Sequence, residues 1–271
     1  MDKKSLQQVL GFLSTPPLWK NNLFGLSQFN FPLDISAEDA AISGSPHSIL
    51  GKRMESFFEA LLKSSTGYEV LASNIQIQNA KITIGEIDFL LKSLTKNQHY
   101  HVELVYKFYV YDPDYQEELE RWIGPNRKDS LLQKIKKLKE KQFPLLYKPE
   151  TKEYLSALQV NPQDLKQEVC FKAQLFLPKH LMQIETSSIN KECVAGYWIH
   201  SEDFFGKDYE HYLFYSPKKQ QWPVDPQYAE NWHSYEVIKK EVETFIERKR
   251  SPLLWMKKSE FEFERFFIVW W

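Results

Sequence analysis

The sequence has little of what several classes of protein require. Its two cysteines, Cys170 and Cys193, are too few for a disulfide framework or a cysteine-based metal site, which favours a reducing cytoplasm. With 35 Lys and Arg against 36 Asp and Glu, the net charge of −1 excludes a protein that coats nucleic acid or membrane by charge alone. No apolar run approaches the roughly 18 residues that a membrane span needs, and no secretion signal is visible. We therefore expect a cytoplasmic protein with no membrane partner.

Internal repeats, low-complexity tracts and linkers rich in Gly and Ser are also missing, which argues against solenoids, propellers and freely jointed domains. Aromatic residues are abundant instead, at 15% of the chain, and they supply bulky material for a packed core. We predict one continuous globule in three parts. Residues 1–44 form a lead-in packed on the core, residues 45–180 form the core itself, and residues 181–271 form a C-terminal extension of unknown role.

Hydrophobic periodicity predicts the elements of the core. Apolar residues at helical spacing predict an amphipathic helix over residues 48–64. Three strand patterns follow at 68–77, 81–91 and 99–110, and their short connections predict antiparallel hairpins. The remaining predictions are helices at 115–122 and 129–142, a strand at 169–177, and, in the extension, strands at 196–200 and 212–215 and a helix at 235–249.

The strand at 99–110 sorts its side chains into two rows, because successive residues of a strand point to opposite faces. One row is apolar and predicts a core face. The other row carries His101, Glu103 and Lys107. A row that gathers an imidazole, a carboxylate and an ammonium is either a site or a solvated surface.

The strand before it adds a second carboxylate to the same neighbourhood. Strict alternation predicts that Ile87 and Phe89 share one face while Asp88 points to the other. If the two strands pair in a tight hairpin, Asp88 and Glu103 lie side by side and repel each other. A hard divalent cation removes that conflict, and carboxylate oxygens with water suit Mg²⁺ or Mn²⁺.

The order of these residues resembles the PD-(D/E)XK nuclease superfamily. A helix with Glu55 is followed by G-E-I-D, which ends in Asp88 on a second strand, and then by Glu103 and Lys107 on a third. Over roughly residues 45–180, the resemblance implies an α/β protein with a restriction-endonuclease-like αβββαβ core and N- and C-terminal additions. More narrowly, the run HVELVYKFYV and the later W-I-G-P-N-x-x-D resemble an uncharacterised bacterial group, the domain-of-unknown-function family 1853.

The resemblance also implies roles. Asp88 and Glu103 would hold Mg²⁺ or Mn²⁺, assisted by the backbone carbonyl of Leu104, and Glu55 would reach the ion from the helix. Lys107 would orient the attacking water and stabilise charge on the phosphate. These roles agree with the chemistry of metal-assisted phosphodiester hydrolysis, in which the ion lowers the pKa of bound water and a nearby ammonium stabilises developing negative charge.

One departure leaves three hypotheses open. In the superfamily the lysine stands two residues after the acid, where this chain has Val105, and Lys107 lies two residues further along the same face. The protein is then a metal-dependent nuclease, or a catalytically inactive nuclease-fold module that binds nucleic acid or a protein partner, or a structural domain with neither activity. In the third case Asp88 and Glu103 are exposed carboxylates in surface salt bridges and Glu55 is an ordinary helix-surface residue.

A local excess of positive charge favours nucleic acid, DNA or RNA, as the partner. The segment from Arg127 to Lys141 has seven basic and two acidic residues, which fits a phosphate-tracking surface as well as a solvated lysine face. The candidate nucleic-acid contacts are His101, Arg127, Lys134 and Lys137. Aromatic residues of the extension could stack on bases, although buried packing is the expected role of the following five: Tyr197, Trp198, Trp222, Trp232 and Trp255.

Overall fold

A computed structural model describes residues 2–31, 35–37, 49–181 and 188–271. The chain forms a mixed α/β protein whose strands are mostly antiparallel, and it divides into two compact units. Unit 1 comprises Met1–Val9, Pro17–Tyr106 and Gln133–Lys172, and unit 2 comprises Leu10–Pro16, Lys107–Leu132 and Ala173–Trp271. The predicted boundary between residues 44 and 45 lies outside the described residues, and the boundary at 180 stays a prediction. Among the described residues, no helix has the length and apolar character that crossing a bilayer demands.

Four elements contribute residues to both units: α1 (Lys3–Ser14), β5 (Gln98–Tyr111), α3 (Leu131–Lys137) and β7 (Leu165–Pro178). Unit 1 also holds β1 (Asn22–Leu23), β2 (Leu26–Gln28), α2 (Leu50–Ser64), β3 (Tyr68–Asn79), β4 (Ile82–Ser93), η1 (Leu138–Gln142), η2 (Phe143–Tyr147), α4 (Pro149–Ala157) and η3 (Pro162–Asp164). Unit 2 also holds β6 (Trp122–Ile123), η4 (Lys191–Cys193), β8 (Val194–His200), α5 (Ser201–Phe204), η5 (Lys207–Tyr209), β9 (Leu213–Tyr215), η6 (Lys219–Gln221), η7 (Pro226–Tyr228), β10 (His233–Ser234), α6 (Tyr235–Glu247), β11 (Leu253–Lys257) and β12 (Phe263–Val269).

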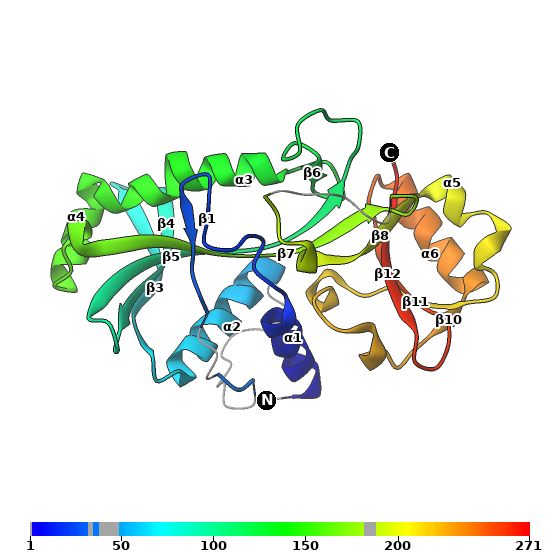
Figure 1. Cartoon of the computed structure of the whole chain (residues 1–271), viewed down its shortest axis with the longest axis horizontal. Helices are drawn as coiled ribbons and strands as arrows, with labels where there is room; N and C mark the ends of the chain where they lie inside the picture. Colours follow the sequence, from blue (N-terminus) through cyan, green and yellow to red (C-terminus); the bar gives the residue numbers. More distant parts are fainter. Residues whose placement is uncertain (1, 32–34, 38–48, 182–187) are drawn as a thin grey trace. The chain divides into compact units, whose positions relative to one another are not determined.

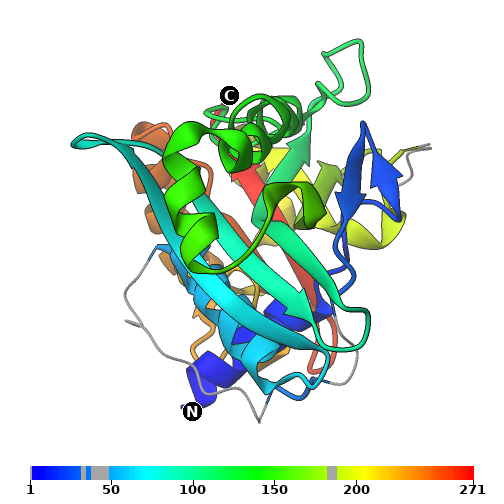
Figure 2. The same cartoon turned by 90° about the vertical axis from the view of Figure 1, so that its left-hand side faces the viewer.

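In unit 1, the three central strands pair in chain order. β3 pairs with β4 and β4 with β5, both antiparallel, and β7 follows β5 in the strand order. Helix α2 covers one face of these strands, and the segment from α3 to α4 covers the other (Figures 1 and 2). Apolar residues three and four apart bury one side of α2, including Met54, Phe57, Phe58 and Leu61. The predicted helix at 48–64 and the three predicted strands are thus confirmed to within two residues at each end.

Strict alternation fails in the middle of β4. Ile87 and Leu90, three residues apart, pack in one cluster with apolar residues of η2 and α4, whereas Phe89 meets Phe58 of α2 at 4.7 Å between ring centroids. The prediction that Ile87 and Phe89 share a face is therefore wrong. The backbone explains it, because Asn74 of the paired strand β3 has a left-handed φ of 53° and is skipped in the pairing with β4, between Ser73 and Ile75. Asp88 lies at this change of face.

Two further predictions about helices need correction. Residues 115–122 form turns that lead into β6, because the Arg121 guanidinium donates hydrogen bonds to the backbone oxygens of Tyr115 and Gln116 that a helix would use internally. The helix predicted at 129–142 begins as α3 at Leu131 and continues as the π-helix η1, which ends at Gln142. The wider turn of a π-helix changes the direction in which the last side chain projects.

In unit 2, the strand order is β10-β9-β11-β12-β8-β7, in which β8 runs parallel to both of its neighbours and the other pairs are antiparallel. An aromatic core packs between these strands and helices α5 and α6. Four of the five aromatic residues considered for base stacking are buried, namely Tyr197, Trp198, Trp222 and Trp255. For these four, the expected packing role is confirmed.

Candidate functional site

Two acidic side chains are buried at the centre of unit 1. Asp88 on β4 is 9% exposed and Glu103 on β5 is fully buried. The β4–β5 ladder ends at Phe89 and Val102, one residue short of both acids. The Leu104 backbone N–H donates a hydrogen bond of 2.9 Å to Asp88 Oδ2. Where the β4–β5 ladder ends, the Leu104 N–H thus donates to the Asp88 carboxylate instead of to a backbone oxygen of β4.

The surroundings of Asp88 disfavour its charged form. Burial raises the pKa of the Asp88 carboxyl well above its usual range, and the negative charge of Glu103 raises it further. The hydrogen bond from Leu104 opposes this shift. The interpretation of Asp88 and Glu103 as exposed partners in surface salt bridges is therefore wrong, since both are desolvated and repel each other.

Polar side chains fix both oxygens of Glu103. His101 Nε2 lies 2.9 Å from Glu103 Oε1, and the Gln142 amide donates to Glu103 Oε2. Lys134 Nζ in turn donates to Gln142 Oε1 at 2.8 Å. Gln142 reaches Glu103 from the end of the π-helix η1. We call these four side chains, together with Gln167, the Glu103 network.

Gln167 on β7 determines how His101 presents its ring. The Gln167 amide nitrogen donates to the Phe143 backbone oxygen at 2.8 Å, which fixes the orientation of the amide. The same nitrogen lies 3.0 Å from His101 Nδ1, which must therefore accept. The ring proton then sits on Nε2 and is donated to Glu103. His101 is fully buried and bonded through both nitrogens.

Glu55 of α2 belongs to a second group of polar side chains beside these carboxylates. The Lys52 ammonium donates to Glu55 Oε2 at 2.7 Å, to Glu86 Oε1 at 2.5 Å and to Asn74 Oδ1 at 3.0 Å. Burial raises the pKa of Glu55, Lys52 opposes the shift, and the charges of Glu86 and Glu103 add to it. We call Lys52, Glu55, Asn74 and Glu86 the Lys52 cluster.

Except for Lys134, the other predicted site residues lie outside the Glu103 network and the Lys52 cluster. Lys107 belongs to unit 2, where its ammonium lies 2.5 Å from Asp129 Oδ2. Arg127, also in unit 2, pairs with Asp112 and lies 3.9 Å over the Trp271 ring. Lys134 and Lys137 both lie on α3; Lys134 joins the Glu103 network, and Lys137 is exposed.

The donor chemistry suits a hard cation. Among the described residues, no three His, Cys, Asp or Glu side chains are placed together ready to enclose an ion. Mg²⁺ needs less, because it usually keeps several waters and binds through one or two carboxylates. Asp88 and Glu103 would supply those oxygens from neighbouring strands. Glu55 would have to leave Lys52 to join them.

Several site residues escaped the sequence analysis. Gln142 and Gln167 have no sequence signal, because their positions depend on the π-helix and on the approach of β7 to β5. Asn74 has none either, since its role follows from a left-handed backbone in a strand. Lys52 does have a signal, because it stands three residues before Glu55 on the same helix, a spacing at which side chains meet.

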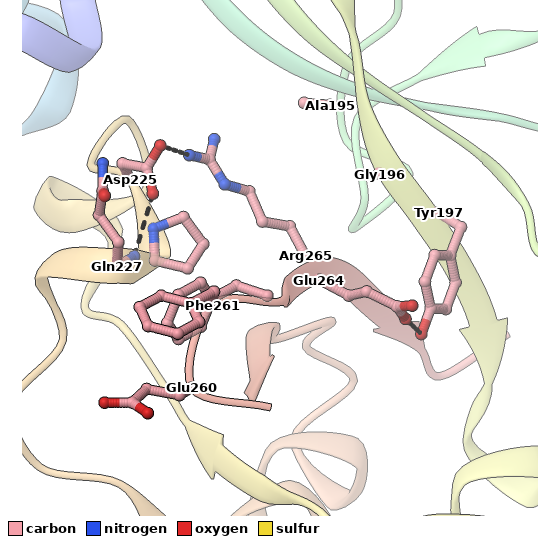
Figure 3. A pocket seen from close by; sticks show the side chains of 11 residues that line it. Ala195, Gly196, Tyr197, Asp225, Gln227, Glu260, Phe261, Glu264 and Arg265 are labelled. Atoms are coloured by element: carbon pink, nitrogen blue, oxygen red, sulfur yellow. Dashed lines mark hydrogen bonds and ion pairs between the residues drawn. The ribbon is translucent and has the colours of Figure 1, made fainter. Parts of the chain in front are cut away.

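Unit 2 contains a cavity of about 860 Å³ at the start of β8 and β12 (Figure 3). Three of the four charged side chains that line it, Asp225, Glu264 and Arg265, already have partners within unit 2. Arg265 contacts Asp225 at 4.0 Å, and Glu264 accepts a hydrogen bond of 2.8 Å from the Tyr197 hydroxyl. Glu264 also pairs with Lys258. This pairing makes the cavity a weaker candidate than the buried carboxylates of unit 1.

Fold and site together define a mixed α/β protein with a buried pair of carboxylates on adjacent strands. Within that class, the chain belongs to the family described as domain of unknown function (DUF1853), whose model matches residues 30–269. The narrower resemblance drawn from the sequence is thereby confirmed. No curated protein and no solved structure matches the chain.

Proposed function

We propose that the protein is a metal-dependent nuclease with a restriction-endonuclease-like core that hydrolyses phosphodiester bonds in nucleic acid. The observation that carries the proposal is the burial of Asp88 and Glu103 on adjacent strands, where the charge of Glu103 raises the pKa of Asp88. Burying two like charges is costly unless a cation offsets them. The order α2–β3–β4–β5–α3–β7, with α4 as an addition, supports the αβββαβ core that the PD-(D/E)XK resemblance implies.

Different residues of unit 1 have different roles in this proposal. Bound Mg²⁺ or Mn²⁺ would supply a Lewis acid and a more acidic water. Asp88 and Glu103 hold the ion, and Glu55 supplies a third carboxylate. His101 and Gln142 keep the Glu103 carboxylate in one orientation, as hydrogen-bond partners of metal ligands commonly do.

Lys134 is the cation that stabilises negative charge on the phosphate in this proposal. Its positive charge lowers the pKa of Asp88, against the larger raising effects of burial and Glu103, so the two side chains lie within electrostatic range. Its hydrogen bond to Gln142 connects it to Glu103. The resemblance gives this role to Lys107, but the ammonium of Lys107 is bonded to Asp129 in unit 2.

Calorimetric titration with Mn²⁺ tests the site. Wild type should bind the ion, and Asp88→Asn or Glu103→Gln should weaken binding by about 100-fold or more, because each removes a ligand charge while keeping the shape. Glu59→Gln is the matched control, since Glu59 lies on α2 one turn after Glu55 and pairs with Lys63 instead. Asp88→Asn that binds Mn²⁺ as tightly as wild type would remove the metal site.

Activity is then measured on labelled single-stranded and duplex DNA and RNA in Mg²⁺. Cleavage by wild type that Asp88→Asn and Glu103→Gln abolish is the expected result. The pairing of Lys107 with Asp129 favours one alternative, an inactive module that keeps the metal and the nucleic acid but lacks turnover. Tight binding of these nucleic acids by wild type with no cleavage would support that module over the enzyme.

A further inference from the structure

The Lys52 ammonium is fully engaged. A lysine ammonium has three N–H donors, and those of Lys52 meet three side-chain oxygens from three different elements, Glu55 on α2, Glu86 on β4 and Asn74 on β3. The Lys52 side chain is nevertheless 47% exposed. It is accessible to a ligand, but it has no N–H to offer while all three acceptors hold it.

Glu55 connects the Lys52 cluster to the buried carboxylates. Its side chain is 17% exposed, and its pKa responds to Lys52 and Glu86 on one side and to Glu103 on the other. The same carboxylate is therefore a partner of Lys52 and the third candidate ligand of a cation at Asp88 and Glu103. Among the described residues Glu55, Asp88 and Glu103 are not placed together around an ion, so Glu55 must move to reach the cation, and that movement draws Oε2 away from Lys52.

Asn74 shows that the Lys52 cluster is built at some cost. Its left-handed φ of 53° is uncommon for a residue inside a strand, although asparagine adopts it more readily than most, and such conformations concentrate at functional sites. With this backbone conformation, the Asn74 amide oxygen accepts a hydrogen bond from Lys52. Lys52 thus keeps two acceptors, Asn74 and Glu86, when Glu55 leaves, so its ammonium stays in place with one N–H released.

We propose that Lys52 is a ligand for the phosphodiester backbone whose availability depends on cation binding. When Glu55 turns to the cation, the released N–H of Lys52 donates to a non-bridging phosphate oxygen. The inference rests on the proposed metal site, and it adds a phosphate ligand that neither the superfamily resemblance nor the sequence assigns. Cation and nucleic acid then bind with positive coupling, and that coupling is reciprocal.

Fluorescence anisotropy measures the coupling. Labelled single-stranded and duplex DNA and RNA of one sequence are titrated in EDTA and in Ca²⁺ at matched ionic strength, with Ca²⁺ used in place of Mg²⁺ to suppress cleavage. Wild type should bind at least one probe about tenfold more tightly in Ca²⁺, within the usual range of coupling between two sites. Lys52→Met should lose that gain while binding Mn²⁺ as tightly as wild type or more tightly, because Glu55 no longer leaves a lysine.

Lys63→Met is the matched control, since Lys63 is an exposed lysine of the same helix that pairs with Glu59, and it should keep the wild-type gain. Glu55→Gln provides a second variant with an opposite effect in EDTA. The substitution weakens the bond between Lys52 and residue 55. The affinity for nucleic acid in EDTA should therefore rise, and the gain in affinity from Ca²⁺ should shrink. Glu59→Gln controls for the loss of one negative charge.

The outcomes separate this inference from the proposed function. Wild type that fails to bind Mn²⁺ overturns both. Wild type that binds Mn²⁺ but shows no gain on any of the four probes overturns the role of Lys52 alone. The role of Lys52 is also overturned if Lys52→Met keeps the full gain, or if Glu55→Gln gives an affinity in EDTA no higher than that of Glu59→Gln.

Discussion

The two units treat polar groups differently. Unit 2 has an aromatic core around Phe204, and the one carboxylate that it buries among the described residues, Asp112, is paired with Arg127. Within that core, Tyr197 stacks on Phe266 with ring centroids 5.0 Å apart. Unit 1 instead buries an imidazole and two carboxylates, His101, Asp88 and Glu103, among its central strands.

The contrast separates side chains that stabilise the fold from side chains that destabilise it and are therefore candidates for function. Packed aromatic rings stabilise a fold directly, because they remove apolar area from water. Desolvated carboxylates that repel each other do the opposite unless a ligand compensates them. Side chains that break the burial rule in unit 1 are therefore the candidates for function, and those that obey it in unit 2 are candidates for structure. Substitutions in each unit test this division.

The largest effect is expected in the core of unit 2. Phe204 is fully buried and its ring lies within 6.0 Å of the rings of Phe205, Tyr209, Phe214 and Tyr235. Phe204→Ala should lower the free energy of unfolding by about 3–5 kcal/mol, because it leaves a cavity that neighbouring rings fill only in part. Denaturant unfolding measures the loss. Phe204→Leu should cost about 1.5 kcal/mol or less.

A loss below about 1 kcal/mol for Phe204→Ala would break the comparison, since the aromatic core would then not be what stabilises unit 2. Mn²⁺ affinity provides the second measurement. It should be unchanged in Phe204→Leu, because no ligand candidate lies in unit 2.

The next effect has the opposite sign and lies in unit 1. Asp88→Asn should raise the free energy of unfolding in EDTA at pH 7 by about 1 kcal/mol, which corresponds to about 2–4 °C in Tm. A neutral amide is less costly to bury than a carboxylate and does not repel Glu103, and its oxygen still accepts the hydrogen bond from Leu104. The pKa of Asp88 is higher in the folded protein than its ordinary value of 3.8, chiefly because of burial. Wild type therefore loses stability as pH rises from about 4 through the folded pKa.

The advantage of Asp88→Asn should accordingly be absent near pH 4 and grow as pH rises. Asp164→Asn is the control, since Asp164 is an exposed aspartate of unit 1, and it should show no such trend. If Asp88→Asn destabilises the metal-free protein at pH 7, the buried carboxylate is a structural group and the contrast between the units fails.

Much of this difference was predictable from the sequence, and the part that was not has identifiable causes. Hydrophobic periodicity predicted α2 and the three hairpin strands, because helix and strand bury their apolar residues at different spacings. The pairing of β4 with β5 then brought Asp88 and Glu103 together. Periodicity carried no information about Gln142 or Gln167, whose side chains reach the site through a π-helix and a distant strand. It failed at Ile87 because alternation assumes an extended backbone, which Asn74 interrupts in the neighbouring strand.

The smallest effect moves the comparison inside unit 1, to two residues with left-handed backbones. Ala80, in the turn between β3 and β4, has a φ of 54°, and Asn74 has a φ of 53°. Ala80→Gly should stabilise the protein by about 0.5–1 kcal/mol, because glycine adopts this conformation without strain. Asn74→Gly relieves less strain, because asparagine adopts a left-handed backbone more readily than alanine, and it also removes one acceptor of Lys52, so its gain should be smaller or absent. Denaturant unfolding in EDTA compares the two. An equal gain from both would mean that the hydrogen bond from Lys52 to Asn74 adds no stability. The backbone of Asn74 would then no longer support the Lys52 cluster as a built site.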